Sequence, residues 1–154
     1  MRLFLLFILI SSMCRAQSLD KERAQIVKSF VLDFQNPKIS VKKIADKYIE
    51  FEPSVEASGE KYKKLKDLIE ILKKEGGCDS CQGGVVDFRK DKIEIINFEK
   101  KSVEDVKLTK LDLSDVYVLW RNGKAMKFFL FRKKKIISFL IFTSQYNATF
   151  IGIG

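Results

Sequence analysis

Two cysteines three positions apart, Cys78 and Cys81, are the residues of this sequence best suited to covalent chemistry. They lie between two pairs of glycines, which predicts a flexible loop. Redox-active pairs of this spacing sit at a helix N-terminus, where the dipole lowers a thiol pKa, whereas this pair follows a predicted helix end. Two thiolates without a further ligand leave a zinc site incomplete. We expect a structural disulfide; a redox pair and a metal site are the alternatives.

Other catalytic chemistries lack their residues. The sequence contains no histidine, which excludes His-based triads, Cys–His pairs and histidine-ligated metals. It also contains no glycine-rich loop that could cradle a phosphate. We therefore expect no catalytic set of residues, no metal and no cofactor.

Acidic residues give only weak candidates for acid–base chemistry. Asp87 and Glu94 face each other in a predicted hairpin, and paired carboxylates can split their pKa values. Arg89 and Lys92 share that face, however, so a solvated and charge-balanced surface is the better interpretation. Candidates for a general base are Asp46, Glu50 and Glu52, which are the acidic residues nearest to the pocket predicted below.

The N-terminus has the features of a signal peptide. A basic start precedes an apolar run over residues 3–10, which has the length of a signal-peptide core and is too short to span a bilayer. Small residues at Cys14 and Ala16 predict cleavage between Ala16 and Gln17, so that residues 1–16 are removed and residues 17–154 form one domain. The alternatives are an uncleaved anchor and a lipoprotein acylated at Cys14, which the bulky Met13 disfavours.

Export changes what the cysteines and the charge imply. Losing Cys14 leaves Cys78 and Cys81 as the only cysteines, and in the periplasm or outside the cell such a pair forms a disulfide. The net charge of the whole chain is +9, but the lysines are dispersed and no arginine-rich groove with interleaved aromatics is present. We expect no specific binding to nucleic acid and no membrane span after signal cleavage.

Apolar spacing predicts three helices in the first half of the domain. Residues 26–34, 41–48 and 60–74 each carry apolar side chains three, four and seven positions apart. Ser18 or Asp20 can cap the first helix and Ser40 the second. A short extended piece is expected at residues 49–53.

The second half of the domain alternates with a period of two, which predicts strands. Residues 86–88 and 93–95 are expected to form a hairpin, and residues 99–113 are a loop, a short helix or a strand. Asn122-Gly123 is a strong signal for a type I′ turn, and a second tight turn is expected at Lys133-Lys134. These turns connect strands over residues 116–120, 125–132 and 135–142.

The two turns predict a register in which Tyr117 pairs with Phe128 and Leu119 with Met126. One face of the sheet then carries Tyr117, Leu119, Met126, Phe128, Leu130, Ile137, Phe139 and Ile141. The opposite face carries Val116, Val118, Trp120, Lys127, Phe129, Phe131, Ser138 and Leu140. Because the second face is too apolar to be fully wet, we expect a partner subunit or the C-terminal tail to cover it.

This order of elements over residues 20–143 resembles the cystatin-like cone of nuclear transport factor 2-like (SnoaL-like) proteins. The resemblance implies an α+β fold in which three N-terminal helices pack on a curved antiparallel sheet. It also implies a pocket inside the curved sheet and dimerisation through the outer face. Enzymes and non-catalytic binding modules share this fold, so it does not give the function.

The resemblance directs attention to two sets of residues. An apolar pocket, or ordinary core packing in its place, is expected from Tyr48, Tyr62, Tyr117, Phe128 and Phe139. A dimer face is expected from Trp120, Phe129, Phe131 and Leu140.

Our leading hypothesis is an exported, non-catalytic domain that binds a small apolar ligand or a protein partner as a homodimer. The alternatives are a pocket enzyme of the isomerase or hydrolase type and a CxxC thiol redox protein. Asn147-Ala148-Thr149 also fits the glycosylation sequon, which matters only in a eukaryotic secretory pathway.

Overall fold

The computed structural model describes residues 2–51, 63, 67, 86–104, 106–108, 111–143 and 148–151. It is an α+β fold in which two N-terminal helices pack against a four-stranded antiparallel sheet that is not strongly curled. The predicted α+β class is therefore confirmed. The predicted third helix and the cysteine pair lie outside the described residues, except for Lys63 and Asp67, which are both helical.

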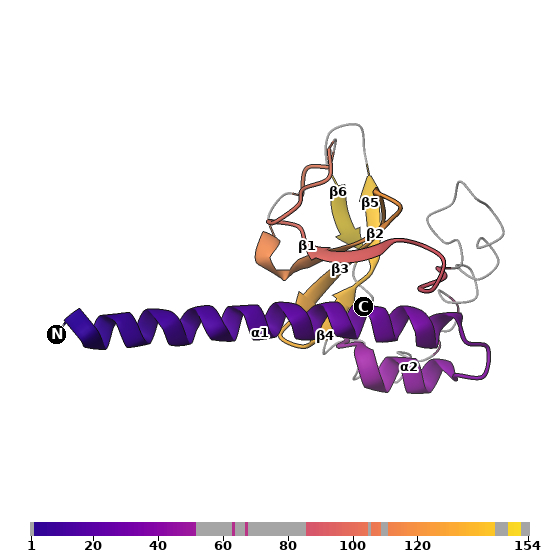
Figure 1. Cartoon of the computed structure of the whole chain (residues 1–154). Coiled ribbons are helices and arrows are strands. Elements are labelled where there is room, and N and C mark those ends of the chain that lie inside the picture. Colours follow the sequence, from indigo (N-terminus) through magenta and orange to yellow (C-terminus); the bar gives the residue numbers. More distant parts are fainter. Residues whose placement is uncertain are drawn as a thin grey trace.

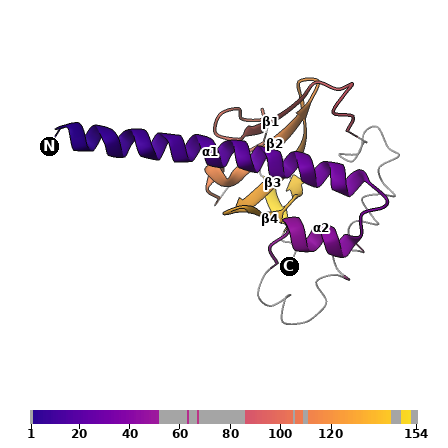
Figure 2. The ribbon, with the colours of Figure 1, turned by 60° about the horizontal axis from the view of Figure 1, so that its bottom comes forward.

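Helix α1 spans Arg2–Gln35 without interruption. Its N-terminal half projects beyond the sheet, whereas its C-terminal half lies across one face of it (Figures 1 and 2). The apolar stripe predicted there is confirmed, because Val27, Phe30 and Val31 are all buried in the core. In the part of the chain that the structure describes, no helix combines the length and apolarity needed to cross a membrane.

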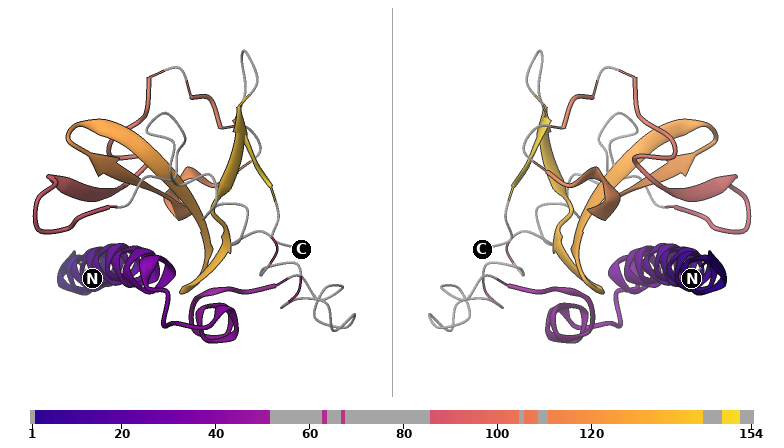
Figure 3. Two further views of the ribbon diagram at one scale, coloured as in Figure 1. Left: turned by 90° about the vertical axis from the view of Figure 1, so that its right-hand side faces the viewer. Right: turned by 90° about the vertical axis from the view of Figure 1, so that its left-hand side faces the viewer.

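Helix α2 spans Val41–Tyr48, as the sequence predicts. The Ser40 hydroxyl accepts a hydrogen bond from the backbone N–H of Lys43 at 3.3 Å, which satisfies one of the free donors of the first turn. The helix buries Ile44, Ala45 and Tyr48. A view along α1 shows the two helices side by side against the sheet (Figure 3).

The main sheet has the strand order β1-β2-β3-β4, with every neighbouring pair antiparallel. A short 3₁₀ helix, η1 (Leu113–Asp115), leads into β2. The chain after α2 adds a parallel bridge between Ile49 and Ile136. The strands are β1 (Ile93–Asn97), β2 (Val116–Arg121), β3 (Lys124–Arg132) and β4 (Lys135–Ser138), and a separate two-stranded ribbon consists of β5 (Leu140–Thr143) and β6 (Ala148–Ile151).

The predicted hairpin between residues 86–88 and 93–95 is wrong, because residues 86–91 contain no strand and β1 pairs with β2. The Asp87 carboxylate accepts hydrogen bonds from the backbone N–H groups of Arg89 and Lys90. Such local bonds from an aspartate compete with extended structure. The structure therefore does not place Asp87 opposite Glu94, which pairs across the ladder with Trp120.

The predicted register between β2 and β3 is also wrong beyond the first residues of the hairpin. The Asn122-Gly123 turn forms with positive φ at both residues, but the register shifts between Leu119 and Trp120, so that Tyr117 pairs with Phe129. One extra residue in a strand moves every later side chain to the other face.

A second shift between Leu130 and Phe131 pairs Leu130 with Ser138, whereas a regular hairpin with its turn at Lys133-Lys134 would pair Leu130 with Ile137. The extra residue is Met126 of β3 at the first shift and Ile137 of β4 at the second. Alternation of apolar residues cannot reveal either shift, because both faces of these strands are apolar.

Both faces of the main sheet are covered. On the helix side, the Phe30 ring packs against four other rings at centroid distances of 5.2–5.9 Å, those of Phe34, Tyr48, Phe129 and Phe139. The other side has its own core, in which Phe98, Trp120 and Phe128 are buried. Partly buried apolar residues of the 103–113 segment and Phe150 pack against that second core.

A polar clamp joins the two helices. The Asp33 carboxylate accepts hydrogen bonds from the Tyr48 hydroxyl at 2.7 Å and from the Lys47 ammonium at 3.0 Å. The hydrogen bond from Tyr48 is the main cause that holds the pKa of Asp33 below its ordinary value. The clamp therefore stabilises the fold only while Asp33 is ionised.

We expect Asp33→Asn to lower the free energy of unfolding by about 1 kcal/mol at pH 7, a modest value because the carboxylate is 25 % exposed. A lowered folded-state pKa means that the contribution is present above the unfolded pKa of about 3.9 and disappears as the pH falls through the folded value. Urea unfolding of the wild-type protein and of Asp33→Asn between pH 2 and pH 7 measures this contribution. Curves that stay equally far apart at the lowest pH would contradict this account.

Candidate functional site

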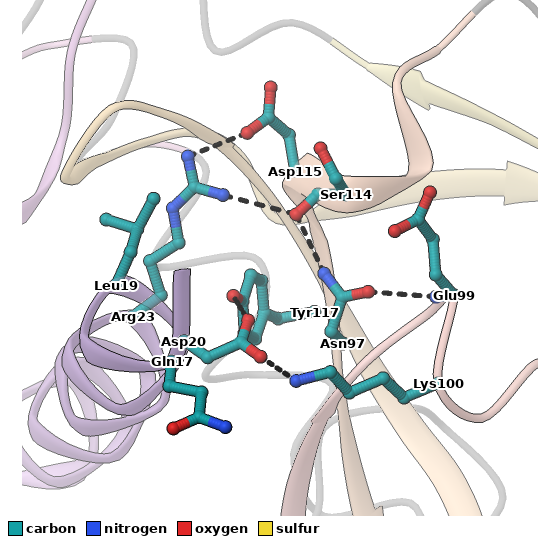
Figure 4. A pocket seen from close by; sticks show the side chains of 10 residues that line it. All are labelled: Gln17, Leu19, Asp20, Arg23, Asn97, Glu99, Lys100, Ser114, Asp115 and Tyr117. Atoms are coloured by element: carbon teal, nitrogen blue, oxygen red, sulfur yellow. Dashed lines mark hydrogen bonds and ion pairs between the residues drawn. The ribbon is translucent and has the colours of Figure 1, made fainter. Parts of the chain in front are cut away.

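A depression of about 340 Å³, lined mostly by polar and charged residues, lies beside the point where α1 reaches the sheet. We call it the α1 depression. Helix α1, the end of β1, η1 and the start of β2 all contribute to its wall (Figure 4). Its lining residues are Gln17, Leu19, Asp20, Arg23, Asn97, Glu99, Lys100, Ser114, Asp115 and Tyr117.

Asp20 is the central acceptor of the depression. Its two carboxylate oxygens accept one hydrogen bond each, from the hydroxyl of Tyr117 and from the ammonium of Lys100. Tyr117 comes from β2 and Lys100 from the turn after β1, so these bonds connect α1 with two separate parts of the sheet (Figure 4).

Tyr117 is a neutral donor at this position. Burial raises the pKa of its phenol above the ordinary value, and the nearby Arg23 guanidinium opposes the shift without cancelling it. A phenol that keeps its proton donates to the Asp20 carboxylate throughout the neutral range. The pair therefore holds a proton at a defined oxygen on the wall of the depression.

Arg23 lies one helical turn after Asp20 and is 5 % exposed. Its guanidinium donates to the carbonyl oxygens of Lys133 at 2.8 Å and Ser114 at 3.2 Å, and it forms an ion pair with Asp115 at 2.7 Å. The same group lies 5.4 Å from the centroid of the Phe131 ring, a distance typical of cation–π contact. One side chain thus fastens α1 to η1 and to the β3–β4 turn.

Asn97 fixes the far wall of the depression. Its amide nitrogen donates to the Ser114 carbonyl at 2.7 Å, and its amide oxygen accepts from the Glu99 backbone N–H at 3.0 Å. Asn97 is buried, so both polar ends of its amide are satisfied away from water. The Ser114 carbonyl consequently receives hydrogen bonds from Arg23 and from Asn97.

The α1 depression is suited to polar recognition. It presents oxygen acceptors, an ammonium and a phenol on a rigid frame, and three of its five charged residues are acidic (Asp20, Glu99 and Asp115). Within the described ranges, no group of three or more Asp, Glu or Cys side chains is arranged to hold a metal ion. Hydrogen bonding and proton transfer are the chemistry that these groups can perform.

The structure separates the residues that the sequence assigned to an apolar pocket. Tyr48, Tyr117 and Phe139 lie in the core on the helix side, whereas Phe128 lies in the core on the opposite side. Tyr62 lies outside the described residues. Of the four that the structure describes, only Tyr117 lines the α1 depression.

The residues assigned to a dimer face are also divided. Phe129 and Phe131 are buried beneath the helices because of the bulge in β3, and Trp120 belongs to the second core. The ammonium of Lys101 lies 4.1 Å from the centroid of the Trp120 ring. Leu140 is in β5, and its side chain is not among those described.

The other sequence-based site predictions stay predictions. Cys78 and Cys81 lie outside the described residues, so no observation bears on their disulfide. Helix α1 runs through Ala16 and Gln17 without a break, and this does not test whether the chain is cut there.

Sequence reasoning missed the residues that build the depression. The sequence gives no binding role to Asp20, Arg23 or Asn97, and it indicates Asp20 only as a possible helix cap. A weak signal was available in α1, where Asp20 and Arg23 are three positions apart and therefore on one side of the helix. Their partners are about 90 positions away in the sequence, and no local pattern indicates such contacts.

Comparisons with known proteins do not identify a family. The chain matches no protein-family model. Neither the curated proteins nor the solved structures give a significant match.

The guanidinium of Arg23 can be tested by a substitution that keeps its charge. We expect Arg23→Lys to lower the free energy of unfolding by about 2–3 kcal/mol, because an ammonium cannot reach three acceptors that lie in different directions. Arg132→Lys is the matched control, since Arg132 is exposed and pairs with Glu50 at 3.1 Å; its cost should stay within about 0.5 kcal/mol. Equal losses in chemical denaturation would contradict the anchoring role of Arg23.

Proposed function

We propose that this chain is an exported, non-catalytic domain that binds a small polar molecule in the α1 depression. The observation that carries the proposal is the set of pre-positioned hydrogen-bonding groups on its wall, with Asp20, Asn97 and Tyr117 each fixed by partners from other elements. Groups held in place before binding lose little entropy when a ligand arrives.

Packing of the interior supports a polar ligand rather than an apolar one. The core is closely filled on both sides of the sheet, where Phe129 and Val118 have 0 % exposure. On the helix side, the ring of Phe30 packs against the rings of Tyr48, Phe129 and Phe139. The apolar ligand expected from the sequence is therefore replaced in this proposal by a polar one.

We keep the resemblance to the cystatin-like cone of nuclear transport factor 2-like proteins as a hypothesis. Two helices, an extended piece that bridges to Ile136 and an antiparallel meander follow one another in the order expected for that fold. In those proteins a curved sheet encloses the pocket, whereas the depression proposed here lies beside α1.

Ligand binding can be tested with the same tyrosine-to-phenylalanine substitution at two positions, one inside the depression and one outside it. We propose titrating the mature chain with a panel of amino acids and monosaccharides and following backbone amide shifts by NMR. A ligand of the depression should shift Asn97 and Lys100, and Tyr117→Phe should weaken its binding about five- to tenfold, the value of one hydrogen bond of ~1 kcal/mol.

Tyr48→Phe is the matched control, because Tyr48 also donates to an aspartate of α1 but lies outside the depression. It should leave the affinity unchanged. The proposed function is wrong if none of these polar probes shifts the amides of Asn97 and Lys100. It is also wrong if the protein binds a fatty acid and none of the polar probes.

A proton-transfer enzyme is the second candidate, and one contact favours it. Asp20 and Tyr117 combine a carboxylate and a neutral phenol in one depression, the pair of groups that can abstract a proton next to a carbonyl and stabilise the oxyanion. In this candidate, Asp20 takes the proton and the Tyr117 hydroxyl donates to the oxygen. Proton exchange of cyclic ketones in D₂O tests it: catalysed exchange that Asp20→Asn abolishes supports it, and exchange at the uncatalysed rate excludes it.

A further inference from the structure

The predicted signal-peptide cut falls near the middle of α1. The N-terminal half of this helix projects beyond the sheet, and its C-terminal half lies across the sheet (Figure 1). Gln17 lies on the wall of the α1 depression, and Asp20 and Arg23 follow it at spacings of three. A cut between Ala16 and Gln17 therefore creates a new chain end at the depression itself.

We propose that the α-ammonium group of Gln17, once released by this cut, binds to the carboxylate of Asp20 and becomes part of the wall of the depression. The proposal rests on the export and processing part of the proposed function. It assigns a role to the mature N-terminus that does not depend on which ligand the depression takes.

Helix capping gives the geometry of this contact. After the cut, Gln17 takes the N-cap position and Asp20 the third position of the helix. An acidic residue at the third position reaches back to the N-cap nitrogen, as in a capping box. The helix dipole also favours a carboxylate in the first turn. In the uncut chain the nitrogen of residue 17 is an uncharged amide inside a continuous helix, so this contact needs the cut.

The Asp20 carboxylate has the capacity for a third donor. Tyr117 and Lys100 hold it in the depression (Figure 4), and an ionised carboxylate offers about four acceptor sites. The charge balance also accommodates another cation, because the lining contains three carboxylates against Arg23 and Lys100. Gln17 and Ser18 are exposed, so the new end can adjust without disturbing the core.

The experiment measures the pKa of the mature α-amino group. A chain of residues 17–154 is released by a site-specific protease, with Gln17→Ser to prevent cyclisation of the terminal glutamine, and the amine is titrated by NMR. We expect its pKa to lie above the ordinary range of about 7.7–8.0 and Asp20→Asn to return it to that range. Glu22→Gln is the matched control, since Glu22 pairs with Lys134 instead, and it should leave the pKa raised.

A second readout uses the native glutamine. In cyclisation the lone pair of the α-amino nitrogen attacks the side-chain amide carbon and ammonia leaves, so a bound ammonium slows the reaction. We expect native Gln17 to cyclise several-fold more slowly than in Asp20→Asn, as followed by intact mass. This comparison remains informative if the Asp20→Asn chain is less stable, because the cyclisation rate in a peptide of residues 17–23 gives the unfolded limit.

Three results would overturn the proposal: an amine that titrates in the ordinary range, a cyclisation rate that Asp20→Asn does not change, or exported protein whose mass shows a first residue other than Gln17. The last result would also remove the processing site from the proposed function. The first two would leave ligand binding at the depression intact, because that is judged from the amide shifts of Asn97 and Lys100.

Discussion

The buried guanidinium of Arg23 is the constraint on which the arrangement of this domain depends. A charge removed from water is tolerated only where hydrogen bonds and an opposite charge replace its hydration. Arg23 finds these partners in Ser114 and Asp115 of η1 and in Lys133 of the β3–β4 turn. The position of α1 relative to the sheet follows from these contacts, and the α1 depression exists because the helix is held there.

Apolar packing supplies the rest of the framework, and it does so on both sides of the sheet. The bulge in β3 sends Phe129 and Phe131 towards the helices and Phe128 towards the second core. It also brings Lys127 to the helix side, where burial lowers the pKa of its ammonium and the Phe34 ring lies 5.8 Å away. Side chains thus occupy both faces of the main sheet, and the α1 depression lies beside this packed core.

Local chemistry could be predicted from the sequence, and contacts between distant elements could not. Ser40 caps α2 and Asn122-Gly123 forms its turn because each depends on neighbours within a few positions. The strand pairing of β1 was mispredicted, since an aspartate turn at Asp87 replaced the expected hairpin. Alternation could not locate the extra residues Met126 in β3 and Ile137 in β4, because both faces of these strands are apolar. The depression was missed because Asp20 and Arg23 meet partners from the other end of the chain.

Amide hydrogen exchange of the protein tests most directly whether Arg23 holds α1 in place. In Arg23→Met, the account predicts that the amides of residues 20–26 lose most of their protection, while those paired between β2 and β3 keep theirs, because the sheet has its own ladder and second core. Unchanged protection of the amides of residues 20–26 would contradict the account, since the helix would then be held in place without the guanidinium.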